Sequence, residues 1–188
     1  MGTVSQAFGL GYLMVGPAGL QTCDVVWACE TNLRNTAMSQ TLSNVLIHFV
    51  YSTKHRQTWL KDKHVRDEMY AIMGKILQDF DCHPILINGV EDHVHVLCDF
   101  TRNYTIKKVV SELKTGPSKW IKTQGVAYQD FQWQNGYGAF SVSQSKKPEL
   151  VDYIRNQEEH HRKWSFQDEL RWLCSLHEVA IDERYIWD

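Results

Sequence analysis

The chain has 188 residues, enough for one domain with a hydrophobic core and too few for two of ordinary size. With 43% hydrophobic residues, 22% charged residues and a formal net charge of -2, the composition excludes an intrinsically disordered or membrane-embedded chain. A near-neutral total names no partner, because binding to a polyanion depends on where Lys and Arg lie on the surface.

The five cysteines are scattered and form no CxxC pair. This pattern favours neither a disulfide framework nor a cysteine zinc site, so we expect a cytoplasmic protein. Cys82 and Cys98 lie within apolar stretches and are expected in the core.

The first 37 residues differ in composition from the rest, with only Asp24, Glu30 and Arg34 as charges. Their apolar stretches are too short and interrupted to span a bilayer, and no positively charged start indicates a secretory signal. We interpret 1–37 as an N-terminal extension without stable structure or as a mis-assigned start, with translation beginning at Met38, and 38–188 as one domain. N-terminal mass spectrometry of the native protein would decide between them.

The first elements after the extension alternate clearly. Residues 44–52, "NVLIHFVYS", predict a strand rich in β-branched and aromatic residues. Apolar residues at spacings of three and four predict an amphipathic helix over 61–80. The stretch 83–100, "HPILINGVEDHVHVLCDF", predicts a hairpin with a turn at Asn88-Gly89.

The second half continues the alternation. A helix is predicted over 105–122, with Gly116-Pro117 kinking or interrupting it. A strand follows at 138–143, then a surface helix over 148–164 with Pro148 in its first turn, and one more short helix with a tail. This order predicts an α+β fold, a ferredoxin-like βαββαβ antiparallel sheet with an added C-terminal helix.

Two histidines one residue apart stand out in "EDHVHVLCDF". Because strand side chains alternate between faces, His93 and His95 should share one face while Val94 and Val96 enter the core on the other. Two neutral imidazoles at this spacing suit a divalent ion, although an isolated H-x-H is more often simply packed.

Tyr153 and Gln157 are four residues apart in "VDYIRNQEEHH", which places them on the same face of the predicted helix. The Gln carbonyl oxygen could complete a site of neutral ligands begun by the histidines. Such ligands leave the charge of the ion unquenched, so that it polarises a phosphate for attack by the tyrosine. A phosphotyrosine ester keeps the energy of the phosphodiester bond, so strands could be cut and rejoined by one chemistry.

In this order, "YSTKHR", "EDHVH", "GYGAFSVS" and "YIRNQEEHH" resemble the motifs of the single-tyrosine HUH transposases of the smallest insertion sequences, including the REP-associated tyrosine transposases. The resemblance extends from about Ser39 to the C-terminus. It implies that His93, His95 and Gln157 bind the metal and that Tyr153 forms a 5′-phosphotyrosine link and frees a 3′-hydroxyl.

The resemblance also implies partners and a cofactor. Members of the family cut single-stranded DNA at hairpin-bearing element ends and work as homodimers, often with active sites shared between subunits. Magnesium or manganese is the implied ion. Imidazole ligands by themselves suit manganese or zinc better than magnesium, so the residues leave the ion open.

Basic and aromatic residues near these motifs are candidates for contacts with DNA. We single out four basic residues for phosphate contacts, with plain solvation as the alternative: Lys54, Arg56, Lys146 and Lys147. Trp133 and Tyr137 could stack on unpaired bases, with core packing expected for at least one of them.

Three polar neighbours of the motifs are expected to stay outside the site. His160 is three residues from Gln157 and could approach the metal or DNA, but His160 and His161 are both interpreted as surface residues of the tyrosine helix. Asp92 could orient an imidazole from behind, but as a strand neighbour of His93 it is expected to point the other way.

Two other function classes compete with a transposase. The histidine-triad phosphohydrolases require a third alternating histidine, and Leu97 stands in its place. A non-catalytic module that binds nucleic acid on its sheet is also compatible with this fold, but the RNP signature of such modules is missing. A domesticated or inactive protein that binds single-stranded hairpins therefore remains the alternative.

Overall fold

The structure is a computed structural model, and it describes residues 42–184 and 186–187. The predicted extension at 1–37 and the proposed start at Met38 lie outside the described residues. Among these residues, no helix is long and apolar enough to cross a membrane.

Four antiparallel strands form one sheet in the order β2-β3-β1-β4. The strands are β1 (Leu46–Ser52), β2 (His83–Gly89), β3 (His93–Asp99) and β4 (Gly138–Val142). The helices are α1 (Lys63–Asp79), α2 (Ile106–Ile121), α3 (Lys147–Arg155), α4 (Gln157–His160) and α5 (Phe166–Leu176). Short 3-10 turns lie at Lys54–Arg56, Lys122–Gln124, Val126–Tyr128 and Gln144–Lys146. The predicted α+β class and ferredoxin-like βαββαβ order are confirmed.

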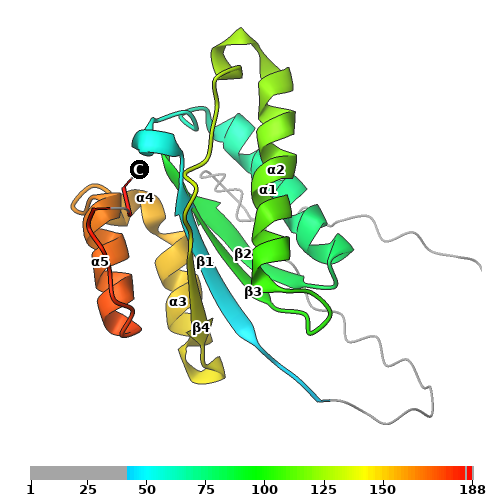
Figure 1. The fold of residues 1–188 in the computed structure, drawn as a ribbon, viewed down its shortest axis with the longest axis vertical. Helices are drawn as coiled ribbons and strands as arrows, with labels where there is room; N and C mark the ends of the chain where they lie inside the picture. The colour runs from blue at the N-terminus through cyan, green and yellow to red at the C-terminus, as the bar shows by residue number, and fades with distance from the viewer. Residues whose placement is uncertain (1–41, 185, 188) are drawn as a thin grey trace, which may run out of the picture.

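The two faces of the sheet carry different helices (Figure 1). Helices α1 and α2 cover one face, where Val94, Val96 and Cys98 join the largest hydrophobic cluster, as the alternation predicts. Helices α3, α4 and α5 cover the other face, towards which β3 points His93 and His95. Every residue of β1 and all but the last of β3 are buried, because both strands are central and covered on both faces.

The hairpin turn lies later in the chain than predicted. Asn88 and Gly89 belong to β2, and the turn is formed by 90–92. Gly89 is required for close approach of the strands, because a Cβ atom there would lie 2.3 Å from the carbonyl oxygen of His93. The Asn-Gly pair therefore correctly predicted a hairpin, but it lies at the end of β2 and not in the turn.

Helix α2 runs through Pro117 without a break, so the predicted interruption at Gly116-Pro117 is wrong. Proline lacks the N–H that would bond the carbonyl oxygen of Leu113. The buried Tyr51 hydroxyl donates a hydrogen bond to that oxygen at 3.4 Å, which offers it another partner. Gly116 faces the Ile76 side chain, where a Cβ atom would lie 2.6 Å from it, so α1 and α2 approach closely here.

The predicted helix over 148–164 is divided at Asn156 into α3 and α4. Asn88 of β2 causes part of this division, since its side-chain amide donates to the carbonyl oxygens of Ile154 at 2.8 Å and Arg155 at 3.1 Å. These bonds satisfy acceptors at the end of α3. Pro148 lies in the first turn of α3, as predicted.

Candidate metal centre with a neighbouring tyrosine

His93 and His95 come from β3 and are fully buried on the face that α3 to α5 cover. Their rings lie edge to face, with centroids 5.2 Å apart. The ring of His48, from β1, stacks on His95, and its Nε2 lies 2.9 Å from His95 Nδ1. The antiparallel pairing of β1 with β3 therefore orients His95.

Asp92 orients His93, contrary to the expectation that it points away. Nδ1 of His93 donates to Asp92 Oδ1 at 2.6 Å. The alternation of side chains along a strand does not apply to Asp92, because this residue precedes the first residue of β3. A carboxylate behind an imidazole fixes the ring and its tautomer, which leaves Nε2 facing the site.

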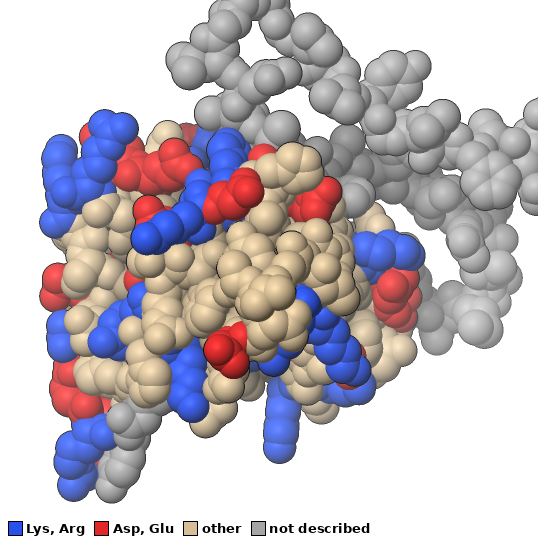
Figure 2. Space-filling view, turned by 90° about the horizontal axis from the view of Figure 1, so that it is seen from above, with Lys and Arg blue, Asp and Glu red and all other residues tan. Residues whose placement is uncertain are grey.

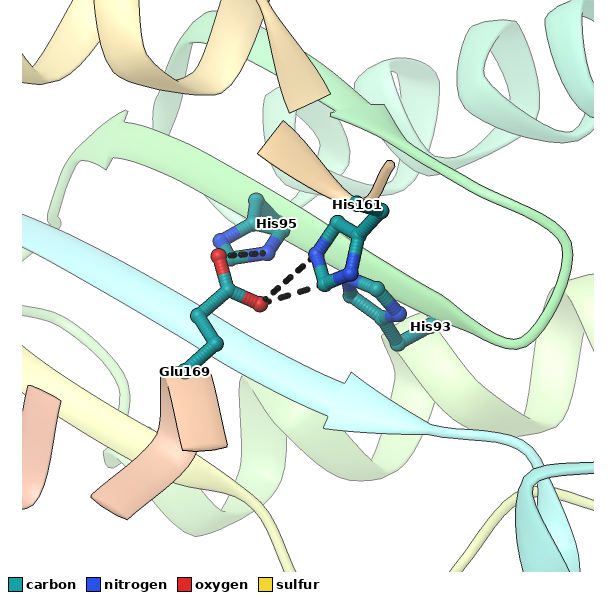
Figure 3. A group of neighbouring side chains, drawn as sticks. All are labelled: His93, His95, His161 and Glu169. Atoms are coloured by element: carbon teal, nitrogen blue, oxygen red, sulfur yellow. Dashed lines mark hydrogen bonds and ion pairs between the residues drawn. The ribbon is translucent and has the colours of Figure 1, made fainter. Parts of the chain in front are cut away.

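Glu169, on α5, is the centre of the arrangement (Figure 3). Its side chain is 1% exposed, and its carboxylate lies 3.4 Å from His93 Nε2 and 3.3 Å from His95 Nε2. His161 Nε2, from the turn after α4, lies 3.1 Å from Oε2 of the same carboxylate. The expectation that His161 is a surface residue is wrong, since its side chain is only 12% exposed.

The electrostatics of the cluster are strongly coupled. Burial opposes ionisation of Glu169, but His95, His161 and His93 together hold its pKa far below the ordinary range. Burial also opposes protonation of His93, but the carboxylates of Asp92 and Glu169 outweigh it and raise the pKa of His93 to about 9. Burial lowers the pKa of His95, and Glu169 offsets only part of that effect.

Gln157 and Tyr153 reach the same carboxylate from α4 and α3. Gln157 is fully buried, donates through Nε2 to Glu169 Oε1 at 3.0 Å, and places its own Oε1 3.4 Å from His93 Nε2. The Tyr153 hydroxyl also donates to Glu169 Oε1. Burial, followed by the negative charge of Glu169, raises the pKa of Tyr153 above its ordinary value. The structure therefore brings together the three predicted metal ligands, His93, His95 and Gln157, and the predicted nucleophile, Tyr153.

The donor set fits a divalent cation. One ligand atom from each of His93, His95, His161 and Glu169 lies within 4.8 Å of the others. His95 Nε2 is buried, and although Glu169 Oε1 lies 3.3 Å away, it makes no well-aligned hydrogen bond among the described residues. Two atoms that each ligate one ion at about 2.1 Å lie roughly 3.0–3.4 Å apart, which agrees with the separations of Glu169 and Gln157 from the imidazoles. The cluster could therefore hold a metal ion.

Glu169 and His161 were missed by the sequence reasoning. Glu169 follows Gln157 by 12 residues and lies on a separate helix, so no fixed spacing connects it to the histidines. The one available signal was a charged residue on the apolar face of α5, where Phe166, Leu170 and Leu173 are buried. A carboxylate on a buried face requires partners, and these are usually cations, hydrogen-bond donors or a metal.

The four basic candidates lie outside the buried cluster, although Arg56 lines a cavity that Asp92 and His161 also line. Lys54 is exposed, Lys146 pairs with Glu149 at 2.7 Å, and the Arg56 guanidinium lies 5.8 Å from the centre of the Trp187 ring. Figure 2 shows basic and acidic side chains interspersed on one face of the molecule. Lys147 begins α3, the helix of Tyr153.

The two aromatic candidates differ in exposure. Trp133 is only 8% exposed and belongs to the main hydrophobic cluster, as expected for at least one of the pair. Tyr137 is 41% exposed, and the Lys114 ammonium lies 5.7 Å from its ring. Of these two rings, Tyr137 has the accessible face.

The sequence of this chain was compared with models of known protein families and with curated proteins, and one family model matches. A family model described as "Transposase IS200 like" matches residues 41–157, more than half of the chain. The match includes His93, His95, Tyr153 and Gln157 and ends before His161 and Glu169. No curated protein matches the chain.

Two solved structures share the fold. A proposed transposase from Deinococcus radiodurans R1 is 21% identical, with a TM-score of 0.51 over 65% of this chain and 98% of that chain. A REP-associated tyrosine transposase bound to a REP hairpin is 14% identical, with a TM-score of 0.51 over 79% of this chain and 93% of that chain.

The contact between Asp92 and His93 predicts a pH dependence. The pKa of His93 is about 9 when folded and near 6.5 when unfolded. Its ion pairs therefore stabilise the fold fully below pH 6.5, and this stabilisation is lost as pH rises through 9. In protein treated with EDTA, Asp92→Asn should lower the pKa of His93, as followed by NMR of the ring protons. The stability gap between the two proteins, from urea unfolding, should be largest below pH 6.5.

The adjacent Glu91→Gln is the matched control, because Glu91 is exposed and is not a cause of the His93 shift. An unchanged His93 titration in Asp92→Asn would contradict the assigned orientation.

The same substitution should also weaken metal affinity by about 10- to 100-fold, as loss of a carboxylate behind a ligating imidazole commonly does.

Proposed function

The chain belongs to the IS200-like transposase family, and from this premise we propose that it cuts and rejoins single-stranded DNA at hairpin-bearing element ends through a metal-assisted 5′-phosphotyrosine intermediate. One observation carries the proposal. The Tyr153 hydroxyl and the two β3 imidazoles converge on one buried carboxylate, Glu169. The proposed nucleophile and the proposed metal ligands therefore meet at one carboxylate in this structure.

His93, His95 and Gln157 would hold the divalent ion, with Glu169 as an additional ligand that the sequence did not suggest. A bound ion would polarise the scissile phosphate and offset the negative charge that develops during displacement. Because Glu169 adds a carboxylate oxygen to the Gln157 oxygen, the site is no longer all neutral. The larger share of oxygen donors favours magnesium or manganese over ions that prefer nitrogen.

Tyr153 would act as the nucleophile. Since its pKa is raised, its hydroxyl keeps its proton at neutral pH and must lose it as it attacks. Glu169 Oε1 accepts a hydrogen bond from this hydroxyl and therefore orients it. Because the pKa of Glu169 is held far below its ordinary range, the carboxylate is a poor proton acceptor, and the proton would pass to solvent. The Tyr153 Oη–P bond would form as the P–O3′ bond breaks, leaving a free 3′-hydroxyl that can later reverse the reaction.

An inactive hairpin-binding protein is the alternative function. The buried cluster argues against it, because removing a carboxylate and several imidazoles from water is costly and binding of DNA alone does not require it. For the DNA itself we propose phosphate contacts by Lys54, Arg56, Lys146 and Lys147, which lie outside the cluster. The REP hairpin bound by the 14% identical neighbour makes a hairpin a suitable first substrate to test.

A covalent adduct tests the nucleophile. Wild-type protein incubated with a labelled single-stranded hairpin oligonucleotide and Mn²⁺ or Mg²⁺ should form a protein–DNA adduct that survives a denaturing gel. The adduct should fall to background in three cases: with EDTA, which removes the ion; with Tyr153→Phe, which removes the nucleophile; and with His95→Ala, which removes a metal ligand. Tyr104→Phe, an exposed tyrosine just before α2, is the matched control and should retain the adduct. An adduct formed by Tyr153→Phe would show that another residue attacks.

We further propose a homodimer whose active sites are shared between subunits. The tyrosine helix, which meets the histidines of its own chain in this structure, would serve those of the other subunit in the dimer. Mixing Tyr153→Phe protein with a His93→Ala, His95→Ala variant should then restore part of the adduct formation that each lacks alone, measured on the same gel. Absence of rescue after the subunits have exchanged would contradict sharing and favour a site completed within each chain.

A further inference from the structure

A cavity of about 330 Å³ opens beside Tyr153. Most of its wall is aromatic and comes from three segments, with Tyr153 on α3, His160 and Trp164 around the end of α4, and Trp172 on α5. Glu169 lies at the same cavity. The cavity is therefore continuous with the proposed active site.

The aromatic rings of this cavity are exposed to an unusual degree. Trp164 is 46% and Trp172 is 41% exposed. Their ring centroids are 6.0 Å apart, and the Trp172 ring lies 5.6 Å from the Tyr153 ring. His160 stands 4.8 Å from Tyr153 on another side. Large apolar rings that gather around one hollow on the surface commonly indicate a binding site.

The charges of the wall distinguish a base from a phosphate. The described lining residues include the carboxylates Glu149 and Glu169 and no Lys or Arg. Without Lys or Arg, the wall offers a phosphate group only the imidazoles of His160 and His161. A nucleobase offers a flat face for the aromatic rings and amino groups that can donate to Glu149. The volume is at the lower end of the range for small-molecule pockets, about 300–1,000 Å³, as expected for one base.

We propose that this cavity holds one unpaired base next to the scissile phosphate, stacked on Trp172 or Trp164. The proposal rests on the proposed function, because it takes the phosphate to be attacked by Tyr153. The scissile phosphate joins two nucleotides, so the base of either one lies directly beside it. A base adjacent to that phosphate is therefore within reach of rings that flank Tyr153. The pocket would select where along the strand the enzyme cuts.

The test is a double-mutant cycle in which protein substitutions are combined with abasic positions in the DNA. It measures DNA binding and needs no cleavage. All proteins carry Tyr153→Phe, and the ligand is a fluorescent hairpin oligonucleotide with a single-stranded flank, in Mn²⁺, followed by anisotropy. An abasic residue is placed at each flank position in turn. At one position next to the cleavage site, its introduction should weaken binding about tenfold, within the range that loss of base stacking gives.

Trp172→Ala and Trp164→Ala should each be tested on the intact and the abasic strands. The variant that removes the stacking ring should weaken binding to the intact strand about tenfold and should cause no further loss at the sensitive abasic position. Additive losses at every position in both variants would overturn the proposal. The matched control is Tyr104→Ala, whose ring is 40% exposed and packs on Phe80, and which should show no coupling to any position.

A second measurement covers variants that fold poorly. With 2-aminopurine at the sensitive position, wild-type rings should quench its fluorescence on binding, Trp172→Phe should retain the quenching, and 2-aminopurine two or more positions away should be unaffected. Equal quenching at all positions would contradict a single base pocket. These outcomes are separable from the proposed function, which fails only if the wild-type chain forms no tyrosine adduct.

Discussion

The site depends on one buried carboxylate. Glu169 accepts hydrogen bonds from Tyr153, Gln157 and His161, and its oxygens lie within 3.4 Å of both β3 imidazoles. Few charges are buried in proteins without partners, and this one has partners from β3, α3, α4 and the turn after α4. The carboxylate therefore connects α5 to the rest of the site and brings the tyrosine to the histidines.

The sheet provides the fixed side of this arrangement. Pairing of β1 with β3 sets His48 against His95, and the same pleat sends Val94 and Val96 into the opposite core. The helical side is positioned by Asn88, which ends α3 just before Gln157. The division at Asn156 lets α4 run on from α3 while Gln157 is buried against the imidazoles.

Local periodicity in the sequence predicted part of the site. Alternation along a strand was enough to place His93 and His95 together. A spacing of four predicted that Tyr153 and Gln157 lie close together, and they do, although the helix is divided between them at Asn156. Periodicity failed where tertiary contacts decide. At Pro117 the helix continues, and Tyr51 from another element bonds the carbonyl oxygen that the proline leaves free. Asp92 lies just before β3, so the alternation of that strand does not apply to it. Glu169 meets the histidines only because α5 folds back onto the sheet.

The central proposal is that His93, His95, Gln157 and Glu169 hold one cation beside Tyr153. Anomalous diffraction from crystals of the protein soaked in Mn²⁺ tests it most directly. We expect one strong peak in contact with the Nε2 atoms of both histidines and a Glu169 oxygen, and loss of that peak in a His93→Ala, His95→Ala variant. A peak that contacts neither imidazole, or no ordered ion at saturating Mn²⁺, would contradict the account.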